Sequence, residues 1–184
     1  FGVDDIRSEL IKRFALLTDD KSVETDLIPY VIKAGAYSSS GNLGWFKNRI
    51  ENGDTPAEMK KYLYQGLGWF QDRETTAAIL DYIMASIEPQ NRIQVIREIT
   101  SNSEFDPILW NWFSNRFSDI SGMHVYFRSV FLAEIIPFCI PEREEDLDVL
   151  LDEYIASDSD APLGVLAMAR EKRRIFAALK DRRE

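Results

Sequence analysis

Residues 55–84 read TPAEMKKYLYQGLGWFQDRETTAAILDYIM, and this stretch decides the fold class. Apolar side chains recur every three or four residues on both sides of the Gln71-Asp72 break, which is the spacing of one face of a helix. Thr55, Pro56 and Glu58 predict a helix start, with Thr55 as the N-cap, Pro56 in the first turn and Glu58 completing a capping box. We therefore expect two helices joined by a short turn.

The same periodicity covers most of the chain, whereas the alternation of a β-strand persists nowhere. Further helices are expected over residues 3–17, 23–36, 45–50, 88–99, 106–117, 125–138, 142–155 and 162–184. Roughly ten short helices with short loops favour antiparallel neighbours. The predicted fold is all-α, a superhelical array of antiparallel helices like a HEAT or armadillo α-solenoid, without a strict sequence repeat.

Composition limits the classes of function. The chain has 184 residues, 45% apolar and 29% charged, which fits one globular domain over residues 1–184. No apolar run approaches the ~20 residues of a membrane span, and a formal net charge of −9 argues against binding nucleic acid. The single cysteine allows no internal disulfide, which favours a cytoplasmic location. Because the first residue is Phe1, we expect a fragment of a longer polypeptide.

The residues of a catalytic centre are absent from the sequence. A zinc site of the peptidase type needs a pair of histidines at helical spacing, and His124 is the only histidine. No phosphate-binding loop and no nucleophile elbow occurs. We expect His124 to be a surface or capping residue and Cys139 a small core residue, and we predict no catalytic residue, metal ligand or cofactor for this chain.

Five segments, in order along the chain, resemble the C-terminal helical domain of the gluzincin zinc aminopeptidases. That family includes puromycin-sensitive aminopeptidase and the tricorn-interacting factors. The segments are Asp26–Val31, Glu58–Gly68 with the following Asp72, Ile79–Met84 with the following Ile87–Gln90, Leu109–Phe113 and Ala169–Phe176. The chain departs from the family pattern at Asn91, where an Asp is usual, and at Arg173, where an Asn is usual.

The resemblance implies a non-catalytic role beside a separate domain that carries the zinc. The C-terminal domain of that family covers the active site, encloses the substrate cavity, and binds or gates peptides. The implied partners are a parent catalytic domain, with zinc bound there, and a peptide substrate. Arg128 and Arg170 are the candidates for binding a peptide's C-terminal carboxylate, because arginine pairs with carboxylates in a bidentate manner. For each arginine the alternative is an ion pair with a carboxylate of a neighbouring helix.

Two other classes of function stay open. One is a HEAT-like adaptor that binds a partner protein and has no peptidase attached. The other is a ligand-sensing domain whose pocket is lined by the four tryptophans Trp45, Trp69, Trp110 and Trp112.

Overall fold

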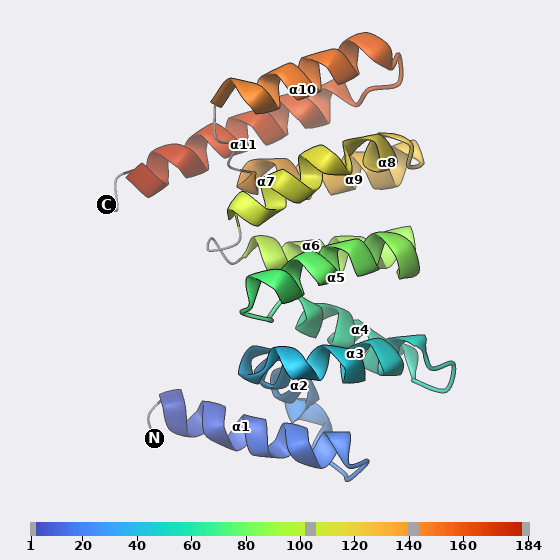
Figure 1. Cartoon of the computed structure of the whole chain (residues 1–184), viewed down its shortest axis with the longest axis vertical. Coiled ribbons are helices and arrows are strands. Elements are labelled where there is room, and N and C mark those ends of the chain that lie inside the picture. The colour runs from blue at the N-terminus through green and yellow to red at the C-terminus, as the bar shows by residue number, and fades with distance from the viewer. Residues whose placement is uncertain (1–2, 102–105, 140–143, 182–184) are drawn as a thin grey trace. The chain divides into compact units, whose positions relative to one another are not determined.

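The computed structural model describes residues 3–101, 106–139 and 144–181, and no strand occurs among them (Figure 1). The chain divides into two compact units, Phe1–Ile99 and Thr100–Glu184. The predicted all-α, solenoid-like fold is confirmed, because each unit is built from short helices packed in succession. That the two units form a single domain stays a prediction. None of the described helices is long and apolar enough to cross a membrane.

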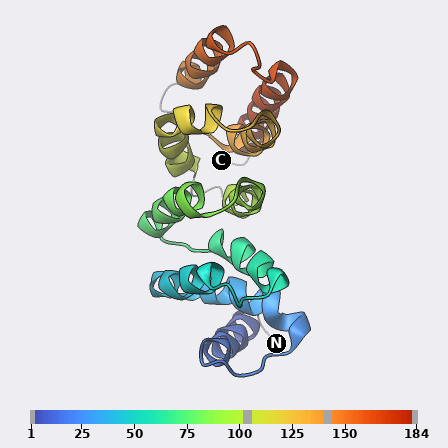
Figure 2. The same ribbon diagram turned by 90° about the vertical axis from the view of Figure 1, so that its right-hand side faces the viewer.

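The first unit stacks its helices around a row of aromatic rings. It holds α1 (Val3–Thr18), α2 (Ile28–Ser38), α3 (Leu43–Glu51), α4 (Ala57–Leu67), α5 (Arg73–Ser86) and α6 (Pro89–Thr100), except for the last residue of α6. Helices α5 and α6 lie side by side as a pair (Figure 2). The ring of Phe46 lies between Phe14 and Phe70, with centroid distances of 6.0 and 5.3 Å. All three side chains are buried. Full burial of an apolar side chain of this size stabilises the fold by about 1.5–3 kcal/mol.

Glycine allows the turn after α4 to approach α6 closely. A Cβ on Gly68 would lie 2.3 Å from Cβ of Glu98 and 2.8 Å from the backbone of Ile99. Beside this contact, Glu98 accepts a hydrogen bond of 2.6 Å from the indole N–H of Trp69 and forms an ion pair of 3.1 Å with Lys33. Residues of α2, the α4–α5 turn and α6 are thereby joined.

The predicted capping box at Thr55 is wrong. Helix α4 begins at Ala57, and Pro56, with φ −57° and ψ 145°, occupies the N-cap position without a side-chain cap. Because this proline is extended, the helix begins one residue later than predicted and the Thr55 side chain is set back from the first turn. Glu58 instead accepts a hydrogen bond of 2.9 Å from the Tyr62 hydroxyl. A side-chain cap does occur on α5, where Asp72 accepts from the amide of the third residue of that helix.

The second unit is likewise built around packed aromatic rings. It holds α7 (Asp106–Asn115), α8 (Phe117–Ser121), α9 (Val125–Ile135), α10 (Glu144–Ser157) and α11 (Leu163–Asp181). Phe117 packs edge-on against Phe113 and Tyr154, with centroid distances of 5.4 and 5.2 Å. A single helix was predicted over 125–138, but the α-helix ends at Ile135 and a 3₁₀ turn, Ile136–Phe138, follows it. The change occurs because Pro137 cannot donate a backbone hydrogen bond.

The last helix is anchored through a buried arginine. The Nε of Arg173 donates a hydrogen bond of 2.9 Å to the backbone oxygen of Cys139, and Phe176 packs against Phe138 at 5.2 Å. The Cys139 side chain is fully buried, as predicted for a small core residue. Arg173, which departs from the family pattern, therefore has a structural role.

Candidate functional site

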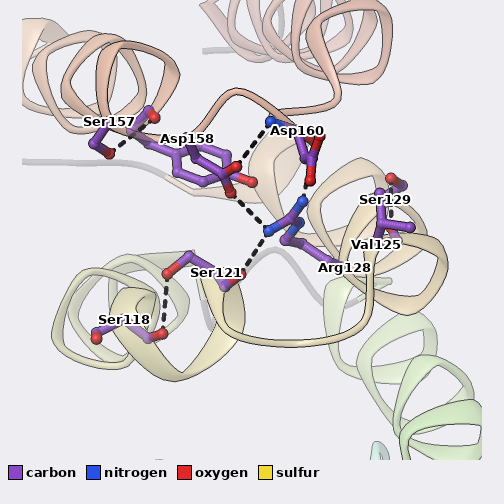
Figure 3. Close-up of polar contacts among 9 residues, drawn as sticks. Ser118, Ser121, Val125, Arg128, Ser129, Ser157, Asp158 and Asp160 are labelled. Atoms are coloured by element: carbon purple, nitrogen blue, oxygen red, sulfur yellow. Dashed lines mark hydrogen bonds and ion pairs between the residues drawn. The ribbon is translucent and has the colours of Figure 1, made fainter.

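Arg128 is a buried charge that joins three segments of the second unit. It lies on α9, and only 7% of its side chain is exposed. One guanidinium nitrogen donates to the backbone oxygen of Ser121 at 2.7 Å and to the carboxylate of Asp158 at 2.8 Å (Figure 3). The other terminal nitrogen donates to the backbone oxygen of Asp160 at 3.0 Å. The end of α8 and the α10–α11 loop are thus held against α9.

Local polar sequence fixes the acceptors around this guanidinium. The hydroxyl of Ser157 donates to the oxygen of Tyr154 at the end of α10, and the carboxylate of Asp158 accepts from the amide of Asp160 at 2.8 Å. Short polar side chains that bond to nearby backbone are typical of turns. At the end of α8, the Ser121 hydroxyl donates to a carbonyl one turn back, as Figure 3 shows. Both loops therefore keep their shape through their own hydrogen bonds.

The surroundings of Arg128 are partly apolar. Its Cζ lies 5.7 Å from the centroid of the Tyr154 ring. Burial raises the pKa of Tyr154, and the positive charge of Arg128 opposes this shift. Within the described residues, the Nε of Arg128 is buried without a hydrogen-bond partner. Of the three acceptors on Arg128, only the carboxylate of Asp158, whose side chain is 28% exposed, could exchange with the carboxylate of another molecule.

Arg170 lies on α11 and also pairs with acidic side chains of its own unit. Its guanidinium forms ion pairs of 3.0 Å with Asp148 and 2.6 Å with Asp152, both on α10. These acids are 51% and 69% exposed, so this pair is far more hydrated than the Arg128 pair. Arg128 and Arg170 share no acidic partner in the described structure. Each is therefore ion-paired with a carboxylate of a neighbouring element, and a role of either in peptide binding stays a prediction.

His124 caps a helix, and within the described part of the first unit Trp45 and Trp69 do not line one pocket together. His124 is the N-cap of α9, where its Nδ1 accepts from the amide of Tyr126 at 3.4 Å, as expected for a capping residue. Trp45 lines a pocket in the first unit, but Trp69 is bonded to Glu98 and does not line that pocket. Trp110 and Trp112 both belong to the second unit, on α7. Among the described residues, no group of three or more His, Cys, Asp or Glu side chains could hold a metal ion.

The sequence did not identify the partners of Arg128. Ser121, Asp158 and Asp160 are 7, 30 and 32 residues away from it. From the Ser-Asp-Ser-Asp run at 157–160 the sequence predicted only a loop. The two acids of this run could have been proposed as partners of the arginine in the apolar helix. An arginine within the apolar helix 125–138 was the feature that singled out Arg128.

Comparison with known proteins gives one family. The family model described as the ERAP1-like C-terminal domain matches residues 1–173. No curated protein and no solved structure matches the chain. The match spans nearly the whole sequence and confirms the family resemblance inferred from the ordered helical segments. The chain belongs to the ERAP1-like C-terminal domain family, the C-terminal domain of the M1 aminopeptidases.

Proposed function

We propose that this chain is the non-catalytic C-terminal domain of a zinc-dependent aminopeptidase. In that role it covers the active site, encloses the substrate cavity, and binds peptides or gates their access. The observation that carries the proposal is the family match over residues 1–173. The parent catalytic domain, and the zinc bound there, are the partners that this role requires, and we propose a cytoplasmic location for the whole protein.

The side chains of this chain do not suit the metal site of the proposed enzyme. Peptidase zinc sites use three protein ligands with a histidine pair among them, and His124 is the only histidine. Its Nδ1 already accepts a hydrogen bond as a helix cap. The zinc and the general base therefore belong to the catalytic domain, and the contribution of this chain is shape, charge and peptide contacts.

Net charge supports a role in attracting peptides. The formal charge of −9 gives the chain a negative field, and a wall of one sign around a cavity concentrates ligands of the opposite sign. The amino terminus of a peptide is such a ligand. Replacing exposed carboxylates of α10 such as Glu145 and Glu153 by amides should therefore weaken substrate capture at low salt more than at high salt. An unchanged apparent KM at both salt concentrations would contradict this role of the charge.

Arg128 and Arg170 are the candidates for the carboxyl end of the peptide. Because Arg128 already binds Asp158, a peptide carboxylate would have to replace the Asp158 carboxylate while the two backbone acceptors stay in place. Arg170, with partly exposed acids as partners, requires a smaller rearrangement. Arg170→Gln in the parent enzyme should raise KM for peptides with a free carboxyl end and leave KM for peptide amides unchanged. Equal effects on both substrates would exclude carboxylate recognition.

The test of the proposal is aminopeptidase activity on a fluorogenic amino-acid amide. Three proteins are compared: this chain with added zinc, the full product of its gene, and that product with this domain removed. We expect activity that a chelator abolishes in the full product and none in this chain alone. Removal of the domain should change the preference for peptide length rather than the cleavage chemistry. A full product that is inactive and binds no zinc would refute the proposal and favour a HEAT-like adaptor.

A further inference from the structure

A pocket in the first unit has no place in the role proposed above. It has a volume of about 250 Å³ and lies where the α1–α2 loop, α3 and the start of α4 meet. Pockets for drug-sized ligands occupy roughly 300–1,000 Å³, so this one suits a smaller molecule. Within the described residues, its lining combines an apolar wall with charged groups of both signs.

The apolar wall is held rigidly. Trp45 is the largest side chain of this wall, and its indole packs edge-on against Phe14 at 5.1 Å and Phe46 at 5.4 Å. The guanidinium of Arg49 lies 5.7 Å from the centroid of the indole and forms an ion pair with Asp20. The charge of Arg49 is thus satisfied by Asp20 within the pocket lining.

Besides the Arg49–Asp20 pair, the lining contains one cation, Lys21, and one anion, Asp54. Asp54 lines the pocket, and its backbone amide donates a hydrogen bond of 3.0 Å to the side-chain oxygen of Asn52. Next to it, the hydroxyl of Thr55 is buried and, among the described residues, makes no hydrogen bond. The ammonium of Lys21 pairs with Asp19 at 3.2 Å, but both side chains are 62% exposed, so this pair is weak and exchangeable.

We propose that this pocket binds a free α-amino acid with a bulky apolar side chain, such as leucine. The ligand carboxylate pairs with Lys21, the ligand ammonium pairs with Asp54, and the side chain packs on Trp45. An isolated zwitterion satisfies two rim charges of opposite sign, which neither a simple anion nor a simple cation does. The proposal rests on the proposed function only for the origin of the ligand, since an aminopeptidase releases such amino acids. In that case the pocket would sense a product of the parent enzyme.

The experiment is ¹⁹F NMR of this chain labelled with 5-fluorotryptophan and titrated with L-leucine. The four tryptophans give four resonances, and the Trp45→Phe variant assigns the one at the pocket. We expect saturable movement of the Trp45 resonance alone, so that Trp69, Trp110 and Trp112 serve as internal controls. No movement of the Trp45 resonance at millimolar leucine, or equal movement of all four, would overturn the proposal.

Ligand analogues separate a free amino acid from the end of a peptide. Leucinamide lacks the carboxylate, as an amino-terminal peptide residue does, and N-acetyl-leucine lacks the ammonium, as a carboxyl-terminal residue does. Loss of one charge-assisted hydrogen bond should weaken binding roughly tenfold in each case. An analogue that binds as tightly as leucine would show that the missing charge is not recognised, and would contradict the proposal.

Rim variants complete the test. Lys21→Gln should weaken leucine binding roughly tenfold and abolish the advantage of leucine over leucinamide, whereas Asp54→Asn should abolish the advantage over N-acetyl-leucine. Lys12→Gln and Asp26→Asn change the charge equally at exposed positions outside the pocket lining and should leave binding unchanged. The leucine titration measures binding without catalysis. A chain that does not bind leucine would therefore leave the outcome of the aminopeptidase assay unchanged, and an inactive parent protein would leave the outcome of the titration unchanged.

Discussion

Replacing Arg128 by methionine tests whether the buried guanidinium holds the second unit together. Methionine keeps most of the apolar stem but removes the charge and all the donors. Three acceptors then lose their partner: the oxygens of Ser121 and Asp160, and the carboxylate of Asp158. Breaking a buried ion pair by removing one partner costs about 3–5 kcal/mol. Because the Asp158 side chain is 28% exposed and can be rehydrated, we expect the lower end, about 3 kcal/mol.

The matched control is Arg170→Met. Arg170 also makes ion pairs with α10, but its partners are 51% and 69% exposed, and exposed pairs contribute about 0–1 kcal/mol. A double-mutant cycle with Asp158→Asn isolates the Arg128–Asp158 pair, with an expected coupling of about 1–3 kcal/mol. The assay is urea unfolding followed by far-UV circular dichroism, with the free energy of unfolding of each variant compared at pH 7. Costs for the Arg128 and Arg170 variants that agree within about 0.5 kcal/mol would refute the reasoning.

Three further outcomes are expected. Gly68→Ala should destabilise the first unit by about 1–3 kcal/mol because its Cβ has no space beside α6, whereas Gly44→Ala, with nothing within 4 Å, should be neutral or stabilising in thermal unfolding. Hydrogen bonds from the hydroxyl and amide of Thr75 hold the pKa of Asp72 below its usual value. The resulting stability is therefore present above pH ~3.9 and lost as pH falls through the lower folded pKa, so the melting temperature of Asp72→Asn should fall less steeply with acidification than that of the unaltered chain. Cys139, fully buried, should react with a thiol reagent only after unfolding, and rapid labelling of the native chain would contradict its core position.

Periodicity was sufficient to predict the helices, but not the details of where they begin. The repeating apolar positions of 55–84 predicted α4 and α5, because the spacing of apolar residues along one helix face is a local property of the sequence. The prediction of Thr55 as the N-cap was wrong because the conformation of Pro56 depends on how the preceding loop leads into the helix. The α-helix ends at Ile135 because of Pro137. The helix was predicted to extend to Phe138 because the residues from 125 to 138 are mostly apolar.

The surroundings of the candidate arginines could be predicted only in kind. An arginine in an apolar helix requires a partner, and Arg128 has the carboxylate of Asp158. Arg170 lies on the more polar α11 and is also paired with carboxylates. Which carboxylate it binds depends on contacts across 30 residues for Arg128, and no local pattern specifies such a distance. The pocket beside Trp45 is a similar case, since its lining comes from three segments that only the packing of α1, α3 and α4 brings together.

The position of Glu98 has a consequence for how the first unit unfolds. In an ideal repeat array each helix pair contacts only its neighbours, and unfolding can be described by a one-dimensional nearest-neighbour model. Glu98, on α6, reaches Lys33 on α2 as well as Trp69 in the turn between α4 and α5, so it couples helix pairs that are not adjacent along the chain. Such a coupling discourages stepwise fraying from one end and favours a single cooperative transition of the unit.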